Sequence, residues 1–366
     1  MTTAAEIWAR RGILLVGGAA ALTAVLAGLA RLGLDTAWGT ARSVEHGPLF
    51  VLGVFATVIG LERAVALSKP WSYAAPALGA GGAVALLAGL PGAPWAFAAA
   101  SVALVVVNAA IVRRQSAAFT WLMLLGSVVL AAGNLAFALG RPAFEVVSTW
   151  IGFFVLTIVA ERLELSRLAP TPKWATRVLV VLALVLSLAA LAAVLVPAVA
   201  PRVLGAALAL CAGWQLRFDL ARRTVRQRGL PRFAAAGVLL AASWLAVAGA
   251  MLIVAGLPSA GLVYDAILHA VFVGFVVSMV FAHAPIILPA VARIDVPFHP
   301  VLYAPLAVLH LGLAARVLGD LARDALCRQA GAMANALALA LFFAAVAWAR
   351  VAARRSTSRA SHAAGP

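Results

Sequence analysis

Apolar residues form long runs along this chain, and polar residues are confined mostly to the short segments between them. A run of about 20 apolar residues is long enough to cross the hydrocarbon core of a bilayer as a helix. The pattern predicts an all-α polytopic membrane helical bundle with about 12 transmembrane helices. The predicted spans lie near residues 11–31, 47–67, 74–91, 95–113, 117–139, 147–168, 175–198, 202–221, 232–257, 261–290, 301–320 and 330–350. We expect a single transmembrane domain over residues 1–350 and a flexible cytoplasmic tail over 351–366.

The composition supports a membrane protein and excludes several soluble classes. Hydrophobic residues make up 65% of the 366 and charged residues only 11%, which falls outside the range of globular and disordered chains. The formal net charge of +16 does not indicate nucleic-acid binding, because no basic stripe carries interleaved aromatic residues. Cys211 and Cys327 are isolated, so they predict neither a disulfide framework nor a zinc site.

Basic residues are distributed unevenly between the two sides of the predicted bundle. The N-terminus, the connections on its side and the tail hold 21 of the 28 Lys and Arg residues, with the densest cluster at 217–232. Because positively charged loops stay in the cytoplasm, we expect both termini on the cytoplasmic side of a bacterial inner membrane. The cluster at 217–232 is expected to meet anionic headgroups of the lipid bilayer.

A short motif recurs at intervals of four spans. Glu62-Arg63 ends the second span, and Glu161-Arg162 ends the sixth span 99 residues later. In the tenth span, His283 takes the position of the two glutamates, nine residues after a glycine in each case. The spacing favours three four-helix units.

The tenth span carries the most unusual polar residues of the chain. Asp265, His269 and His283 interrupt an otherwise apolar run, and at helical spacing they fall on nearly one face. Polar groups inside a membrane are costly and usually face a cavity, a partner or a cofactor. Histidine is also the commonest metal ligand. The alternative interpretation is a set of packing histidines that only form hydrogen bonds.

Candidate ligands lie at two depths. Near the outer side, His46 at the start of the second span and His269 could sandwich one haem iron. Asp265 could fix the tautomer of His269 by accepting its other ring N–H, although a helix N-terminal acid explains it equally well. Further candidates are His310 as a reserve ligand with Tyr303 on the same face, and, on the inner side, His283, Glu62, Glu161, Arg63 and Arg162.

Two of these features have competing explanations. Arg63 and Arg162 would supply basic groups to haem propionates, but the positive-inside rule also accounts for them. Gly53, Thr57 and Gly60 form a face of small residues below His46. This face permits either the close approach of a neighbouring helix or room for a flat macrocycle.

At these positions the chain resembles the NnrS family. The resemblance rests on His46-Gly-Pro-Leu-Phe in the second span, His269-Ala-Val-Phe-Val-Gly in the tenth, and His310 with Arg316-Val-Leu in the eleventh. That family comprises twelve-helix bacterial membrane proteins associated with haem, copper and the response to nitric oxide. The chain departs from it at Glu45-His46-Gly47-Pro48, where the family has a start like His-x-His-Glu-Met.

A more distant similarity is to the catalytic subunit of haem–copper oxidases. That subunit has twelve helices in three arcs of four, and histidines on its second and tenth helices hold a low-spin haem. His46 and His269 fall on those helices. The sixth and seventh spans carry no histidine, so the copper site of such oxidases has no counterpart here.

The resemblance implies a haem-binding inner-membrane protein linked to the nitric oxide response or to electron transfer. Haem b is the expected cofactor, copper is a second candidate metal, and nitric oxide or a redox partner is the expected partner. Whether the protein is an enzyme stays open, and no residue is assigned a catalytic role. The alternatives are a secondary transporter with Glu62, Glu161 and Asp265 as coupling carboxylates, and a structural or assembly factor. Hydrolases and nucleotide-driven pumps are disfavoured, because no Walker loop, GxSxG, HExxH or dinucleotide motif occurs in a fitting context.

Overall fold

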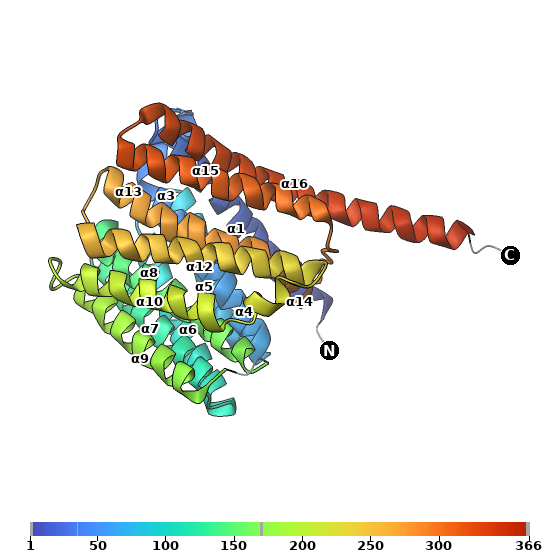
Figure 1. Ribbon diagram of the computed structural model, residues 1–366, viewed down its shortest axis with the longest axis horizontal. Coiled ribbons are helices and arrows are strands. Elements are labelled where there is room, and N and C mark those ends of the chain that lie inside the picture. Colours follow the sequence, from blue (N-terminus) through green and yellow to red (C-terminus); the bar gives the residue numbers. More distant parts are fainter. Residues whose placement is uncertain (1–2, 35, 169–170, 364–366) are drawn as a thin grey trace.

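The computed structural model describes residues 3–34, 36–168 and 171–363, with side chains up to residue 353. All regular secondary structure among these residues is helical, and no strand occurs in them (Figure 1). The helices are α1 (Ala4–Ala30), α2 (Ala37–Ala41), η1 (Ser43–Glu45), α3 (His46–Pro48), η2 (Leu49–Ala56), α4 (Thr57–Leu67), η3 (Pro70–Tyr73), α5 (Ala74–Leu87), α6 (Ala93–Arg114), α7 (Ala118–Ala138), α8 (Ala143–Ser166), α9 (Lys173–Ala192), α10 (Ala200–Phe218), α11 (Ala221–Thr224), α12 (Leu230–Ala255), α13 (Leu262–His269), η4 (Ala270–Val277), α14 (Ser278–Ala292), η5 (Pro300–Leu302), α15 (Tyr303–Ala322) and α16 (Ala325–Ala363).

The prediction of a polytopic helical membrane bundle is confirmed. Ten helical segments of the described chain are long and apolar enough to cross a membrane. The third and eighth predicted spans correspond to α5 and α10, which are helical but are not among these ten. Helix α5 has 14 residues, and at about 1.5 Å per residue it is shorter than a hydrocarbon core of about 30 Å.

The two ends of the chain lie at the same end of the bundle (Figure 1), which we call the inner end; the opposite end is the outer end. At the inner end, Arg10 and Arg11 of α1 donate hydrogen bonds to the carbonyl groups of Val291, Ala292 and Arg293, where α14 ends. These bonds tie the first helix to the tenth span. The backbone of α16 is helical to Ala363, well into the stretch expected to form a flexible tail, and residues 364–366 lie outside the described part.

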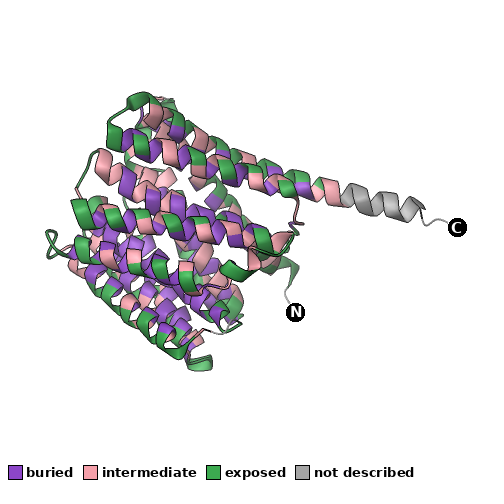
Figure 2. Cartoon of the chain, in the orientation of Figure 1, coloured by how far each residue is buried: buried purple, intermediate pink, exposed green. Residues whose placement is uncertain are grey.

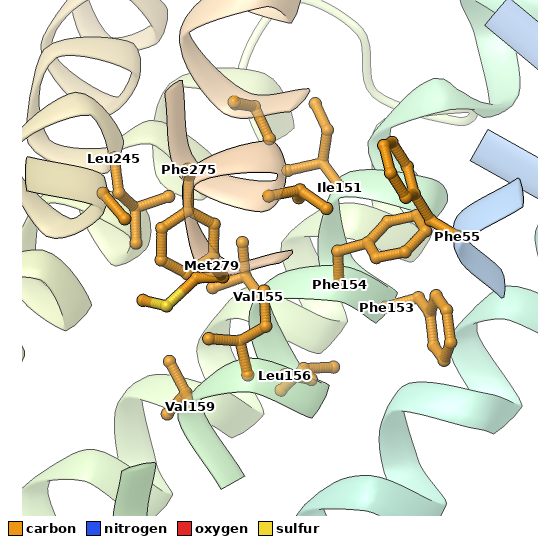
Figure 3. Close-up of a cluster of buried hydrophobic side chains, with 14 of the residues drawn as sticks. Phe55, Ile151, Phe153, Phe154, Val155, Leu156, Val159, Leu245, Phe275 and Met279 are labelled. Atoms are coloured by element: carbon orange, nitrogen blue, oxygen red, sulfur yellow. The ribbon is translucent and has the colours of Figure 1, made fainter. Parts of the chain in front are cut away.

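Helix α8 is the centre of the bundle. It is apolar on all sides, and every residue in 146–160 is buried, as expected for a helix without a polar face. Its Phe154 ring contacts Phe55 of η2 and Phe272 of η4 edge-on, with ring centres 6.1 and 6.0 Å apart. Figure 3 shows this helix packing between Phe55 on one side and Phe275 on the other. The second and tenth spans are therefore both held against α8.

The sides of the bundle carry many exposed apolar side chains, on the helices that are long and apolar enough to cross a membrane. Figure 2 shows the exposed positions in green. Inside, small residues let neighbouring helices approach closely. A Cβ atom added to Gly53, Gly152 or Gly274 would lie within 3.2 Å of a side chain on α5, α9 or α12, respectively. The glycine of the sequence repeat thus marks a close helix contact in each unit.

The same contacts decide between the two interpretations of the small-residue face below His46. Gly53 faces Ala83 of α5, and Gly60 lies against Pro76 of the same helix. This face is filled by α5, so it leaves no room for a macrocycle. The space for a ligand lies elsewhere.

Candidate functional site

A cavity of about 500 Å³ lies in the outer half of the bundle. Its walls come from α1, η2, α8, α13, η4, α15 and α16, and they include the rings of Phe50, Phe55 and Phe272. The volume is within the usual range of about 300–1,000 Å³ for small-molecule sites, which are also mostly apolar. The polar groups on the cavity wall include two histidines, His46 and His269.

The two imidazole rings lie close together and nearly parallel. Their centres are 6.2 Å apart and their planes are inclined by only 20°. With metal–nitrogen distances of about 2.0–2.1 Å and roughly 1.1 Å from nitrogen to ring centre, two imidazoles on opposite sides of one metal ion place their centres about 6.2–6.4 Å apart. The ring-centre distance of His46 and His269 therefore equals that of two such ligands.

Hydrogen bonds fix which ring nitrogen is available. Nδ1 of His46 lies 2.6 Å from the carbonyl oxygen of Ala24, and Nδ1 of His269 lies 2.8 Å from that of Asp265. A carbonyl oxygen only accepts, so each Nδ1 carries the proton and donates. Among the described residues neither Nε2 has a hydrogen-bond partner. In both rings Nε2 is thus the unprotonated nitrogen, the form that binds a metal.

Each histidine lies within three residues of the start of a π-helical segment of eight residues. His46 lies three residues before η2, and His269 is the last residue before η4. Short π-helical stretches inside α-helices are rare and often occur at functional sites. The central helix α8, which has no histidine, is a regular α-helix throughout. The π conformation thus accompanies the two histidine-bearing spans of the repeat and not the third.

Close packing against α1 places the His46 ring. A Cβ atom added to Gly28 would lie only 2.6 Å from Cε1 and 2.7 Å from Nδ1 of His46. Glycine at this position lets the imidazole lie flat against the helix and reach the carbonyl of Ala24. The sequence analysis did not identify Gly28, because a lone glycine in an apolar helix carries no sign of its partner.

Ion pairs surround the cavity at its outer end. Arg316 of α15 binds both carboxylate oxygens of Asp265, with distances of 2.9 to 3.2 Å. Asp320 lies one turn further along the same helix, a spacing that predicts a pair with Arg316, but it pairs with Arg328 at 2.9 Å instead. Asp265 does orient His269, but through its backbone carbonyl; its carboxylate lies 3.5 Å from Nδ1 of that histidine.

The inner candidates form a different kind of cluster. The guanidinium of Arg63 lies between Glu62, at 2.7 Å, and Glu161, at 3.4 Å, and its Nη1 is 3.0 Å from the sulfur of Met123. The structure thus brings the two glutamates of the repeat together through an arginine. None of these residues lines the outer cavity.

His283 and Arg162 lie near this cluster. Nδ1 of His283 donates to the carbonyl of Met279 at 2.8 Å, and the ring is within electrostatic reach of Arg162. Arg162 approaches Asp219, just beyond α10, at 3.8 Å. Burial raises the pKa of Asp219 above its ordinary value, and the charge of Arg162 opposes this rise. Arg162 is thus paired at the inner end and does not line the cavity in which a haem would need basic groups.

The remaining two candidates are occupied by other contacts. Both ring nitrogens of His310 have partners: Nδ1 accepts from Trp244 at 2.9 Å, and Nε2 lies 3.3 Å from the hydroxyl of Ser278. Tyr303 packs edge-on against Phe233, with ring centres 5.2 Å apart. Neither residue lines the cavity, so the structure does not place the reserve ligand beside His46 and His269.

No group of three or more His, Cys, Asp or Glu side chains within the described ranges is arranged to hold a metal ion. The two cavity histidines supply two ligands, so any metal there needs the rest of its coordination from another source. A porphyrin supplies four nitrogens and needs one or two axial ligands from the protein. The donor set therefore fits a haem better than a metal ion bound by side chains alone.

The fold and the cavity define a multi-pass helical membrane protein with a histidine pair in its outer half. The chain belongs to the family described as Domain of unknown function (DUF8744), whose model matches residues 10–351. No curated protein and no solved structure matches the chain.

Proposed function

We propose that this protein binds one haem in the outer cavity, with His46 and His269 as its two axial ligands. The observation that carries the proposal is the ring-centre distance of 6.2 Å between two imidazoles whose Nε2 atoms are both free. Haem b is the expected form, and the resemblance to the NnrS family is consistent with it. Copper is not part of the proposal, because the described residues offer it no cluster of side-chain ligands.

Basic groups at the cavity support an anionic ligand. Arg31, Arg316 and Arg328 all line the cavity, and Arg31 donates a hydrogen bond to the carbonyl of Ser43. In the proposed orientation only seven of the 28 basic residues lie on the outer side, and three of those seven line this cavity. Lys and Arg are in excess in cytoplasmic loops and less frequent in loops on the other side of the membrane. Three arginines at one outer cavity therefore need an explanation in the cavity itself. Haem propionates provide one for Arg31, which forms no ion pair with a described carboxylate, whereas Arg316 and Arg328 are already paired with Asp265 and Asp320. In this proposal Arg31 takes the role first expected of Arg63 and Arg162.

The arrangement suits one-electron chemistry. A haem with both axial positions filled by imidazole supplies electron transfer, and its potential depends on burial and on hydrogen bonds to the ligands. The protein contributes apolar walls that exclude water and two carbonyl groups, of Ala24 and Asp265, that orient the ligand rings. We therefore propose a role in electron transfer or in the response to nitric oxide, with a redox partner or nitric oxide as the partner.

The location we propose is the bacterial inner membrane, with both termini in the cytoplasm and the cavity towards the periplasm. This orientation follows from the 21 basic residues on the side of the termini. Cysteine labelling would test it: reagents that do not cross the membrane should fail to label residues in 217–232 from outside, and labelling there would overturn the orientation.

The transporter alternative gains no support from the contacts. Its three coupling carboxylates are all paired with arginine: Glu62 and Glu161 with Arg63, and Asp265 with Arg316. A carboxylate that loads and releases a proton or cation needs to be free of such a partner for part of its cycle. We therefore retain the haem proposal alone.

The test is the haem content of protein purified from cells supplied with haem. The wild type should show a Soret band with about one haem per chain, and His46→Ala and His269→Ala should each lose most of it. His283→Ala is the matched control, because that ring also donates Nδ1 to a backbone carbonyl at 2.8 Å yet does not line the cavity. Loss of haem in His283→Ala with retention in His269→Ala would move the site to the inner end.

A further inference from the structure

Two neighbouring helices bring basic and aromatic side chains together at the inner end of the bundle. Helix α9 begins there with Lys173 and Trp174, and α10 ends there with Arg217 and Phe218. The Phe218 ring packs edge-on against Trp174, with ring centres 5.3 Å apart, and the guanidinium carbon of Arg217 lies 5.0 Å from the centre of the same ring. The ends of the two helices therefore form one continuous surface.

The turn after α10 adds a second arginine beside Arg217. The carboxylate of Asp219 accepts a hydrogen bond from the backbone N–H of Ala221 at 2.7 Å, which fixes the backbone where α11 begins. Nη1 of Arg222 then donates to the carbonyl of Arg217 at 2.9 Å. Arg217 and Arg222 are thus held next to each other.

A second basic pair lies on α9, where Lys173 and Arg177 are one helical turn apart. All four basic side chains are exposed, and none of them forms an ion pair with a described carboxylate. Their charges are therefore available to an external anion. The surface, which we call the α9–α10 patch, consists of Lys173, Trp174, Arg177, Arg217, Phe218 and Arg222.

An apolar stripe runs outward from this patch along α9. Val178, Val181, Val185 and Leu188 follow Trp174 at helical spacings of three and four residues, and their side chains are 37% to 68% exposed. At about 1.5 Å per residue the stripe is about 21 Å long, which is more than half of a hydrocarbon core of about 30 Å. Acyl chains of the inner leaflet can lie along it while their headgroup meets the patch.

We propose that the α9–α10 patch binds an anionic phospholipid with two phosphate groups, of the diphosphatidylglycerol type. The two basic pairs, one on α9 and one at the end of α10, each bind one phosphate, and the Trp174–Phe218 contact lies where the two helices meet. Basic sites between transmembrane helices suit such headgroups, and a tryptophan suits the boundary between headgroups and hydrocarbon. The inference assigns a lipid class and a site, beyond a general attraction of residues 217–232 to anionic lipids, and it does not depend on haem.

The test compares lipids with two phosphates and with one. The purified protein, stripped of lipid in detergent, is titrated with diphosphatidylglycerol or with phosphatidylglycerol at equal total phosphate, and native mass spectrometry counts the bound lipid. The wild type should bind one diphosphatidylglycerol at least about tenfold more tightly, because this lipid engages two further basic groups. Replacing Arg217 and Arg222 together by Gln should weaken its binding about 25-fold, or about fivefold for each basic group.

The same segment supplies the matched control. Arg226 and Arg228 are also exposed, but the ring of Phe218 contacts Trp174, Trp214 and Arg217 instead. Replacing Arg226 and Arg228 together by Gln removes the same charge and should weaken binding less than about twofold. Thermal unfolding without lipid checks that the two double variants are equally folded.

Two results would overturn the inference. An equal loss of affinity in the two double variants would show that only the total charge of the segment attracts lipid. Equal binding of the two lipids by the wild type would remove the second phosphate from the site, and that comparison needs no variant to fold.

Discussion

The outer cavity and the inner cluster both place polar side chains inside an apolar bundle, but they satisfy them in different ways. At the inner end, Arg63 forms ion pairs with both Glu62 and Glu161, so each charged side chain of the cluster has a partner within the protein. At the outer end, His46 and His269 each use one ring nitrogen and leave the other facing a cavity of about 500 Å³. Buried polar groups normally have a hydrogen-bond partner, so the unpartnered Nε2 atoms of His46 and His269 at the outer end indicate a ligand site.

The comparison separates two reasons for placing polar residues in a membrane. Paired charges hold helices together, because each is costly to bury without the other. Here the inner cluster joins α4 to α8 in this way. The outer site contains such a pair as well, Asp265 with Arg316, but it supports a histidine whose second nitrogen is free. Function is therefore indicated by what remains unpaired rather than by polarity itself.

The largest effect is expected from Asp265→Asn. The change removes the carboxylate that binds the guanidinium of Arg316 through both oxygens. The side chain of Asp265 is 21% exposed and that of Arg316 is 10% exposed. Removing one member of a buried pair costs about 3–5 kcal/mol, and partial exposure brings our expectation to about 2–3 kcal/mol of unfolding free energy. Thermal or detergent-induced unfolding of the purified protein measures it.

Glu62→Gln is the counterpart at the inner end. Arg63 keeps Glu161 at 3.4 Å, so the loss should stay below about 1 kcal/mol. For the outer substitution, Asp265→Asn, the amount of haem bound per folded chain should be unchanged. The ring of His269 is held by the backbone carbonyl of Asp265, which this substitution keeps. Equal destabilisation by the two substitutions would remove the distinction between the two ends.

An effect smaller than that of Asp265→Asn is expected from Gly28→Ala, which acts on one ligand without touching any charge. The added methyl group would lie 2.6 Å from the ring of His46, so the imidazole must move away from the carbonyl of Ala24. We expect haem affinity to fall at least tenfold, or about 1.4 kcal/mol, in a Soret titration. Gly18→Ala on the same helix has nothing within 4 Å and should leave affinity unchanged. Unchanged affinity in Gly28→Ala would show that the position of His46 does not matter for binding.

The sequence was sufficient to predict the helical bundle, because runs of apolar residues identify membrane spans without knowledge of the tertiary contacts. It also selected His46 and His269 as a pair, since both lie towards the outer end of their apolar spans. It could not show that Arg316 pairs with Asp265 rather than Asp320, because the i,i+4 spacing suggests a partner that a different helix supplies instead.

Other parts of the site depend on contacts that no local pattern encodes. His310 looked available because its sequence neighbours are apolar, yet Trp244 and Ser278 from other helices occupy both its nitrogens. The π-helical segments after His46 and His269 were not expected either, because an apolar run of residues does not distinguish π-helical from α-helical backbone.

The most direct test of the account is electron paramagnetic resonance of the oxidised wild-type protein, purified with haem. Two imidazole ligands on one iron predict a purely low-spin ferric signal, with about one spin per chain, that is lost or becomes high-spin in His46→Ala and in His269→Ala. A high-spin signal in the wild type, or a low-spin signal that persists in both variants, would contradict the central claim that these two histidines hold a single haem.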